Sequence, residues 1–132
     1  MEDQGQAEPQ GRTYDLKDRL LEFSVRVMDV VEALPNSRVG NHVAGQLIRC
    51  GTSPAANYNE AISAESRNDF LHKLSVALKE LRETAFWLEV TRRRNLIKPA
   101  ARLEPLIKEC GELIAIVAAS IRTAESNRSP KG

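Results

Sequence analysis

The stretch Lys73-Leu-Ser-Val-Ala-Leu-Lys-Glu-Leu-Arg-Glu-Thr-Ala-Phe-Trp-Leu88 decides the fold of this chain. Here leucine or alanine recurs alternately three and four residues apart, at Leu71, Leu74, Leu78, Leu81, Ala85 and Leu88. A seam with this period is typical of a helix that packs lengthwise against other helices. Ser66 and Asp69 precede the seam with the spacing of an N-terminal cap. We therefore expect a long helix that begins after Ser66.

The same apolar spacing on either side of this stretch predicts three more helices. They are expected at about residues 15–34, at about residues 41–64, and from near Pro99 toward the C-terminus. Turn-forming residues at positions 35–37 and 95–99 separate these segments. Strand signals are absent. Four helices of about 20 residues or more with short connections predict an all-α, antiparallel up-and-down four-helix bundle.

Two residues depart from regular helix chemistry. Pro54 removes a backbone donor and clashes with the preceding turn, so the second helix is expected to kink or break near it. Gly111 lies inside the fourth helix, where glycine costs roughly 1 kcal/mol relative to alanine. A close approach of another helix at Gly111 would explain that cost.

Length and composition are those of one ordinary domain. The chain has 132 residues, of which 42% are hydrophobic and 28% charged, enough to bury a core. Residues 1–12 and 126–132 lack apolar periodicity and are expected to be disordered tails around a bundle at 13–125. The net charge of +1 means that any binding of nucleic acid depends on local clusters of basic residues, or on several subunits sharing a surface.

Cysteine use and hydropathy indicate a cytoplasmic protein. Cys50 and Cys110 occupy apolar-periodic positions and are expected to be buried free thiols in a reducing compartment. The polar N-terminus lacks the apolar core of a signal peptide. The longest apolar run, residues 113–119, is far shorter than the roughly 20 residues that span a membrane. No membrane association is expected.

The first and third helices each carry a second apolar face. Leu21, Val25 and Met28 lie opposite the main seam of the first helix, and Val76, Trp87 and Val90 lie away from that of the third. A helix with two apolar faces is buried on two sides, which predicts a homo-oligomer with these residues in its interface. Alternatively, they are scattered exposed apolar residues, which are normal on protein surfaces.

Several motifs carry a resemblance to a known family. They are Gln46-Leu-Ile-Arg-Cys-Gly-Thr-Ser53, Ala56-Asn57 with Glu60-Ala61, Ala64-Glu-Ser-Arg-Asn-Asp-Phe70, His72 to Glu80, and Glu83-Thr84 with Trp87-Leu88. The chain closely resembles the S23-like four-helix-bundle proteins encoded by intervening sequences of 23S ribosomal RNA genes. Where many members have an Ile-Gly or Ile-Pro step, this chain has Ser53-Pro54-Ala55.

The resemblance implies an antiparallel bundle that assembles as a homopentameric ring, with no established enzymatic activity. A related bundle family, similar at the level of the fold alone, serves diversity-generating retroelements. There a basic pentamer binds a reverse transcriptase and nucleic acid. The resemblance thus implies RNA, such as ribosomal RNA, as one partner. The alternative is a protein-binding adaptor, for example for a reverse transcriptase.

The densest basic cluster comprises Arg92, Arg93, Arg94, Lys98 and Arg102, which Lys108 extends. Repeated around a ring, it would create a strong positive field and contact RNA phosphates. Alternatively, it is a solvated helix end whose cations complement the helix dipole, with Glu89 paired to Arg93. The cluster has no interleaved aromatic residue for base stacking.

Asn57, Glu60 and Arg67 are expected to have structural roles near the kink. Arg49 and Arg67 are candidate partners of Glu60, and Asn57 is a candidate donor to the carbonyl freed by Pro54. Buried polar groups of this kind fix register or bridge subunits.

Enzyme chemistry is not indicated by the sequence. His42 and His72 are isolated from other metal ligands at suitable spacing, and the Glu-x-x-His pairs of di-iron bundles are missing. The sequence contains no phosphate-binding glycine loop and no nucleophile elbow. We therefore expect neither metal, cofactor nor catalytic residues.

Overall fold

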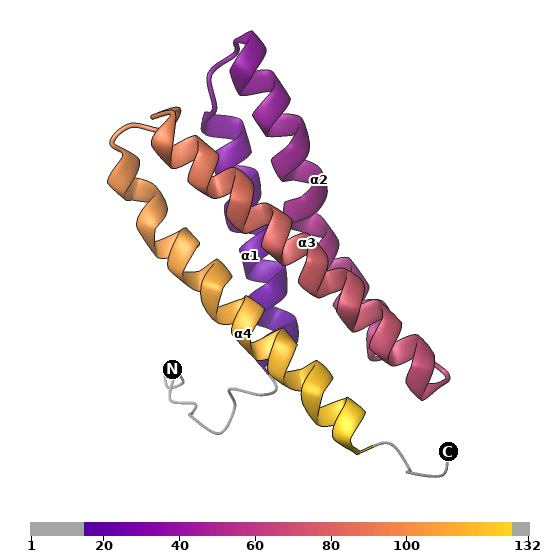
Figure 1. Ribbon diagram of the computed structural model, residues 1–132. Coiled ribbons are helices and arrows are strands. Elements are labelled where there is room, and N and C mark those ends of the chain that lie inside the picture. Colours follow the sequence, from indigo (N-terminus) through magenta and orange to yellow (C-terminus); the bar gives the residue numbers. More distant parts are fainter. Residues whose placement is uncertain (1–14, 128–132) are drawn as a thin grey trace, which may run out of the picture.

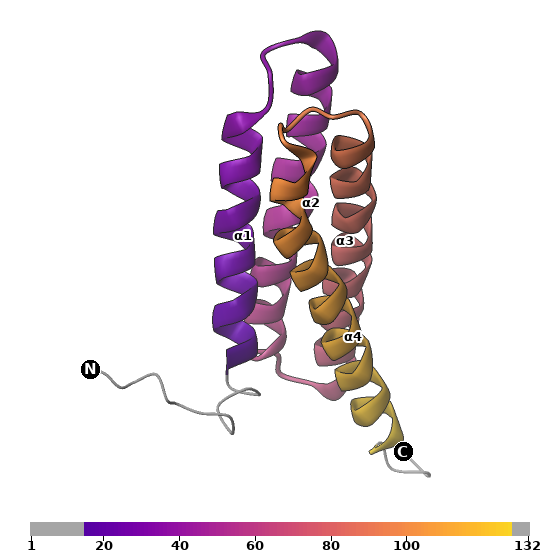
Figure 2. The same cartoon turned by 90° about the vertical axis from the view of Figure 1, so that its left-hand side faces the viewer.

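The computed structural model describes residues 15–127. This part of the chain forms α1 (Asp15–Ala33), α2 (Arg38–Ala61), α3 (Arg67–Arg93), the short 3₁₀ helix η3 (Ala100–Leu103) and α4 (Glu104–Ser126), with no strand. Successive helices run in opposite directions and pack into a bundle (Figures 1 and 2). The predicted all-α four-helix bundle is confirmed. The expected tails lie outside the described residues, except for Ser126, which belongs to α4, and Asn127, which caps it.

Helix caps explain where α2 and α3 begin. Ser37 caps α2 by accepting a hydrogen bond from the backbone N of Gly40 at 3.0 Å, so α2 starts three residues before the predicted Asn41. The same helix ends at Ala61, short of the predicted Ala64. Ser66 accepts from the backbone N of Asp69 at 3.0 Å, which confirms the predicted cap of α3.

The start of α4 differs from the prediction. Pro99 precedes η3, and the α-helix itself begins at Glu104. A helix starting at Pro99 would place Pro105 in its interior, where proline lacks a donor for the carbonyl four residues earlier. Beginning at Glu104 puts Pro105 in the first turn, where no donor is needed.

The core lies between the inner faces of all four helices. Its fully buried side chains include Leu20, Phe23 and Val27 of α1, Leu47 and Cys50 of α2, Leu74, Leu81 and Leu88 of α3, and Cys110, Leu113 and Val117 of α4. Both cysteines are free and buried, as predicted. Arg19 of α1 also binds Glu109 of α4 with two hydrogen bonds of 2.8 and 3.0 Å.

The buried stripe of α3 is not the strict heptad that was predicted. Leu78 and Ala85 are half-buried, whereas Ala77, Thr84 and Thr91 are fully buried. The hydroxyls of Thr84 and Thr91 donate to the carbonyls of Glu80 and Trp87, each at 2.8 Å. Because these hydroxyls are satisfied within their own helix, threonine is tolerated in the core.

Helix α2 is continuous through Pro54, so the alternative of a break is wrong, and the kink predicted near Pro54 stays a prediction. Gly51, one turn earlier, is buried, and a Cβ atom on it would lie 2.5 Å from Cγ1 of Val27. The carbonyl of Gly51 accepts a hydrogen bond from Ser24 Oγ of α1 at 3.3 Å. Packing against α1 therefore supports α2 where the proline removes a backbone hydrogen bond.

Gly111 does not mark a close helix approach. It is exposed, and a Cβ atom added there would meet nothing within 4 Å. The expectation at Gly111 was therefore wrong, and the tight contact lies at Gly51.

These two glycines give a matched pair of variants. Gly51→Ala is expected to destabilise the fold by about 1–3 kcal/mol, because the buried Val27 side chain must move. Gly111→Ala is expected to stabilise it by roughly 0.5–1 kcal/mol, because alanine loses less backbone entropy in a helix. Urea denaturation of the two variants measures both effects. Equal effects of the two substitutions would contradict the close contact at Gly51.

Candidate functional site

The predicted basic cluster gathers at one end of the bundle. Arg92 and Arg93 end α3, Arg94 caps it, Lys98 follows in the connection, and Arg102 belongs to η3. The α3–α4 connection shares this end with the α1–α2 connection (Figure 1). The structure thus brings all five predicted residues into one region.

Two of the four arginines of this cluster, Arg92 and Arg93, form ion pairs with Glu89. Arg92 Nε donates to Glu89 Oε1 at 3.0 Å, and Arg93 Nε donates to Oε2 at 2.7 Å. These hydrogen bonds, that from Arg92 first, lower the pKa of Glu89 from its ordinary 4.5 to about 2. The predicted pair of Glu89 with Arg93 is confirmed, and Arg92 joins it.

The remaining cations have no carboxylate partner among residues 15–127. Arg94, Lys98 and Arg102 are exposed, and Arg102 donates to the carbonyl of Lys98 at 3.4 Å. We call Arg94, Lys98 and Arg102 the basic end. Its charge is not cancelled by ion pairs within the described part of the chain.

A second surface feature is apolar and lies on the outer side of α1. Leu21 is 57% exposed, and Val25 and Met28 are each 43% exposed. We call these three residues the α1 ridge. The candidates on α3 differ from them, because Trp87 and Val90 are half-buried against the chain's own core and Val76 is half-buried. The most exposed large apolar residue of α3 is instead Phe86, at 58%.

Polar contacts join α2 to α3 along their length. Arg49 pairs with Glu80 at 3.2 Å and with Glu83. Trp87 donates from Nε1 to Glu83 at 3.4 Å, and the His42 ring meets the Trp87 ring edge-on at 5.7 Å. This network holds the partly buried indole in place.

The predicted partners of the structural polar residues were wrong. Glu60 pairs with Lys73 at 2.7 Å, because both face the α2–α3 contact, rather than with Arg49 or Arg67. Arg67 instead donates to the carbonyl of Ala124 near the end of α4 at 2.9 Å. Asn57 donates to the carbonyl of Ser53 at 3.0 Å, whereas the carbonyl that Pro54 frees, four residues earlier, is that of Cys50.

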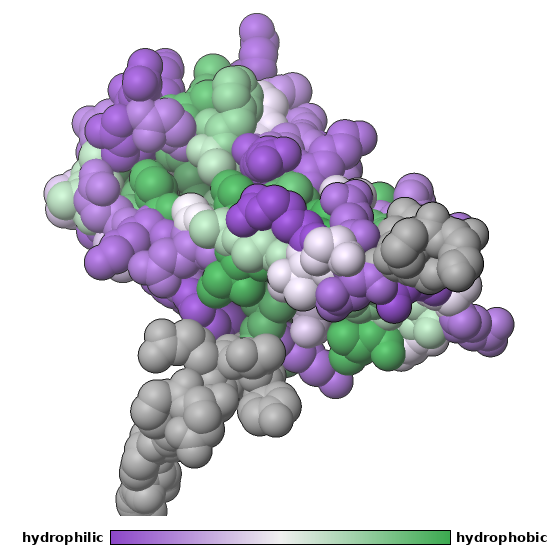
Figure 3. Space-filling view, turned by 60° about the horizontal axis from the view of Figure 1, so that its bottom comes forward, coloured by the Kyte–Doolittle hydropathy of each residue, from purple (hydrophilic) through white to green (hydrophobic). Residues whose placement is uncertain are grey.

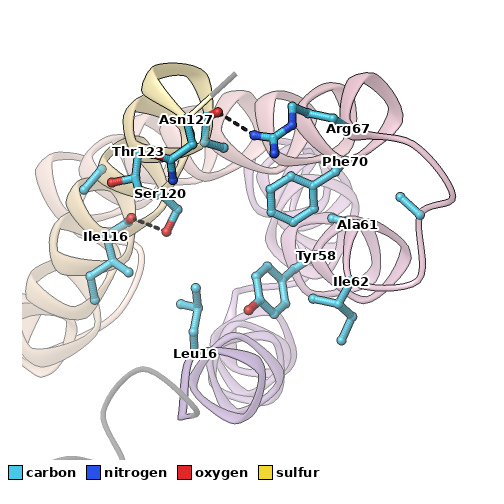
Figure 4. A pocket seen from close by; sticks show the side chains of 13 residues that line it. Leu16, Tyr58, Ala61, Ile62, Arg67, Phe70, Ile116, Ser120, Thr123 and Asn127 are labelled. Atoms are coloured by element: carbon cyan, nitrogen blue, oxygen red, sulfur yellow. Dashed lines mark hydrogen bonds between the residues drawn. The ribbon is translucent and has the colours of Figure 1, made fainter. Parts of the chain in front are cut away.

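A hollow of about 1010 Å³ opens at the opposite end of the bundle. There α4 diverges from α1 toward its C-terminus (Figure 2), and the side chains around the hollow come from all four helices (Figure 4). They include Leu16, Tyr58, Arg67, Phe70, Ser120 and Thr123. Small residues at Ala61, Ala119 and Ala124 leave the space. Seen toward this end, apolar residues reach the surface in several places (Figure 3).

In the described part of the chain the thiols are buried, and the potential metal ligands are not clustered. Burial raises the pKa of Cys110 to about 12 and also raises the pKa of Cys50, so both thiols stay protonated at neutral pH. No group of three or more His, Cys, Asp or Glu residues within positions 15–127 is placed to hold a metal ion. Among the helices described, none is long and apolar enough to cross a membrane.

Sequence reasoning missed Phe86 and the hollow. Phe86 follows Arg82 by four residues and precedes Arg93 by seven, so a helical projection would have placed the three on one side. The alanines of α4 are visible in the sequence, but the divergence of α4 from α1 is a tertiary feature.

The ion pairs of Glu89 predict a pH dependence. Because its pKa in the folded state is below the ordinary value, the pairs stabilise the fold above pH 4.5, and this contribution is lost as the pH falls toward about 2. Carboxyl NMR titration of Glu89 is expected to give a midpoint near 2, rising toward 4.5 in Arg92→Gln/Arg93→Gln. A midpoint near 4.5 in the unaltered protein would show that the ion pairs do not form.

Comparison with known proteins places this arrangement in a family. Residues 12–119 match the family described as 23S rRNA-intervening sequence protein. A crystal structure is known of a protein with unknown function from the S23 ribosomal protein family, from Bacteroides thetaiotaomicron. Its sequence is 37% identical to this chain, and the two structures match with a TM-score of 0.74. The similarity covers 80% of this chain and 97% of that one, whereas no curated protein matches. The chain therefore belongs to the 23S rRNA-intervening sequence protein family.

Proposed function

We propose that this protein is a cytoplasmic, non-enzymatic scaffold whose copies assemble into a closed ring that contacts RNA. The observation that carries the proposal is the α1 ridge. Leu21, Val25 and Met28 expose 43–57% of their surface on a helix whose other side fills the core. Soluble monomers rarely expose such contiguous apolar surface, and a second copy of the chain would cover it.

The interface is centred on α1 rather than on α3. Trp87 and Val90 already pack against the chain's own core, so they leave less apolar surface to cover. Asp18, Glu22 and Asp29 are exposed beside the α1 ridge and would form a polar rim. Five copies is the ring size that the family resemblance implies.

RNA is the partner that the charge distribution favours. The net charge is only +1, yet Arg94, Lys98 and Arg102 are exposed and not paired to carboxylates within residues 15–127. A ring repeats this basic end once per subunit. Several weak phosphate contacts would then act together and raise the overall affinity for RNA. The name of the matched family refers to 23S rRNA, which agrees with this choice.

The assembly predicts a mass change on substitution of the α1 ridge. Val25→Asp is expected to dissociate the oligomer, because a buried unpaired carboxylate is costly. Val39→Asp is the matched control, since Val39 is 42% exposed and lies on α2. Light scattering with circular dichroism would report mass and folding. A folded single copy for the unaltered protein contradicts the proposal.

The RNA contact predicts a charge effect that depends on position. Arg94→Glu/Arg102→Glu is expected to weaken RNA binding and to flatten its salt dependence by about 0.7 per lost phosphate contact. Lys17→Glu/Arg122→Glu changes the net charge equally at the opposite end and is expected to weaken binding much less. Fluorescence anisotropy with an rRNA fragment measures both. Equal losses refute the basic end as the contact. Absence of RNA binding, together with one stoichiometric protein partner, would favour the adaptor alternative.

A further inference from the structure

The outward face of α3 carries a stripe with an unusual composition. At about 100° per residue, Lys79, Arg82, Phe86 and Arg93 fall within an arc of about 60°, on the far side of the helix from the buried residues. All four are exposed. We call them the α3 stripe. It extends about 21 Å along the helix, from its middle to the basic end.

No carboxylate interrupts the α3 stripe. The acidic residues at its two borders, Glu83 and Glu89, are already engaged with Arg49 and with Arg92 and Arg93. Lys79 and Arg82 make no ion pair with any residue of the described chain. Arg93 contacts Glu89 through Nε, and its side chain is still 76% exposed. Lys79 and Arg82 therefore present positive charge that residues 15–127 do not neutralise, and Arg93 keeps the rest of its guanidinium open to solvent.

Phe86 lies between Arg82 and Arg93 on the α3 stripe, and Trp87 supports its ring. Its ring meets the Trp87 ring at 4.9 Å and 82°, while Trp87 is itself held by His42 and Glu83. Phe86 remains 58% exposed. An aromatic ring braced on one side and open to solvent is suited to stacking, because little side-chain freedom remains to be lost.

We propose that the α3 stripe binds single-stranded RNA, with phosphates on Lys79, Arg82 and Arg93 and one base stacked on Phe86. Alternating cations and an aromatic ring are how proteins hold single strands, since every unpaired base has a free π-face. In a duplex the bases are already stacked on each other and Phe86 would find no partner. The inference rests on the proposed function and extends the RNA path from the basic end along α3.

The test uses the full-length protein with a labelled 12-nucleotide polyuridine strand and a labelled, blunt-ended RNA duplex of equal charge. Phe86→Ala is expected to weaken binding of the single strand by about 5- to 150-fold without changing its salt slope. Binding of the duplex should not change, because its bases are already stacked on each other. Phe86→Trp is expected to restore binding. Ile48→Ala, which removes a 39% exposed apolar side chain from α2, is the control and should bind like the unaltered protein.

A second arm separates charge from stacking. Lys79→Gln/Arg82→Gln is expected to flatten the salt dependence for both RNAs, because it removes phosphate contacts. The fluorescence of Trp87, the single tryptophan, is expected to change when the strand binds, since its ring contacts Phe86.

The outcomes distinguish this inference from the proposed function. If Phe86→Ala binds the single strand normally while Arg94→Glu/Arg102→Glu does not, the proposal that the α3 stripe binds RNA is wrong. The proposal that the basic end binds RNA is then supported. If Phe86→Ala lowers the mass of the assembly, or releases a bound protein without affecting RNA, Phe86 belongs to a protein interface and the inference fails. If the unaltered protein binds neither RNA, both proposals fail.

Discussion

The close packing of α1 against α2 at Gly51 determines which face of α1 is buried and which is exposed. Val27 occupies the space that a side chain at position 51 would need, and Ser24 supplies a hydrogen bond to the carbonyl of Gly51. This contact turns the seam of Leu20, Phe23 and Val27 into the core. The other apolar side of α1, with Leu21 and Val25, must then face outward. The proposed assembly is thus a consequence of how tightly one helix fits its neighbour.

Local ion pairing decides which basic residues remain available. Counted along the sequence, Arg92, Arg93 and Arg94 form one cluster, yet Glu89 engages the first two. Arg82, which lies outside the cluster, has no such partner within residues 15–127. A polyanion binds the basic side chains that are not already ion-paired within the protein. These side chains lie along the outside of α3 as well as at its end.

Helix number, helix type and most of the core could be predicted from apolar spacing, because burial of one face imposes the period of the helix. Boundaries were less predictable, since Ser37 as a cap and Pro105 in a first turn depend on local hydrogen bonding. The site was predicted in part. The cluster at residues 92–102 and the α1 ridge follow from the sequence, but the pairing of Glu60 with Lys73 and the exposure of Phe86 depend on how α2 and α3 are rotated against each other.

The hollow between the diverging ends of α1 and α4 has a mechanical consequence. The last turns of α4 carry alanine, serine and threonine where a filled bundle would carry leucine, and Arg67 ties them to α3 through one backbone carbonyl. Because few dispersion contacts resist separation there, we expect local unfolding to begin at this end. We expect the end that bears the arginines to open later, because Leu88, Leu103 and Leu106 are buried there.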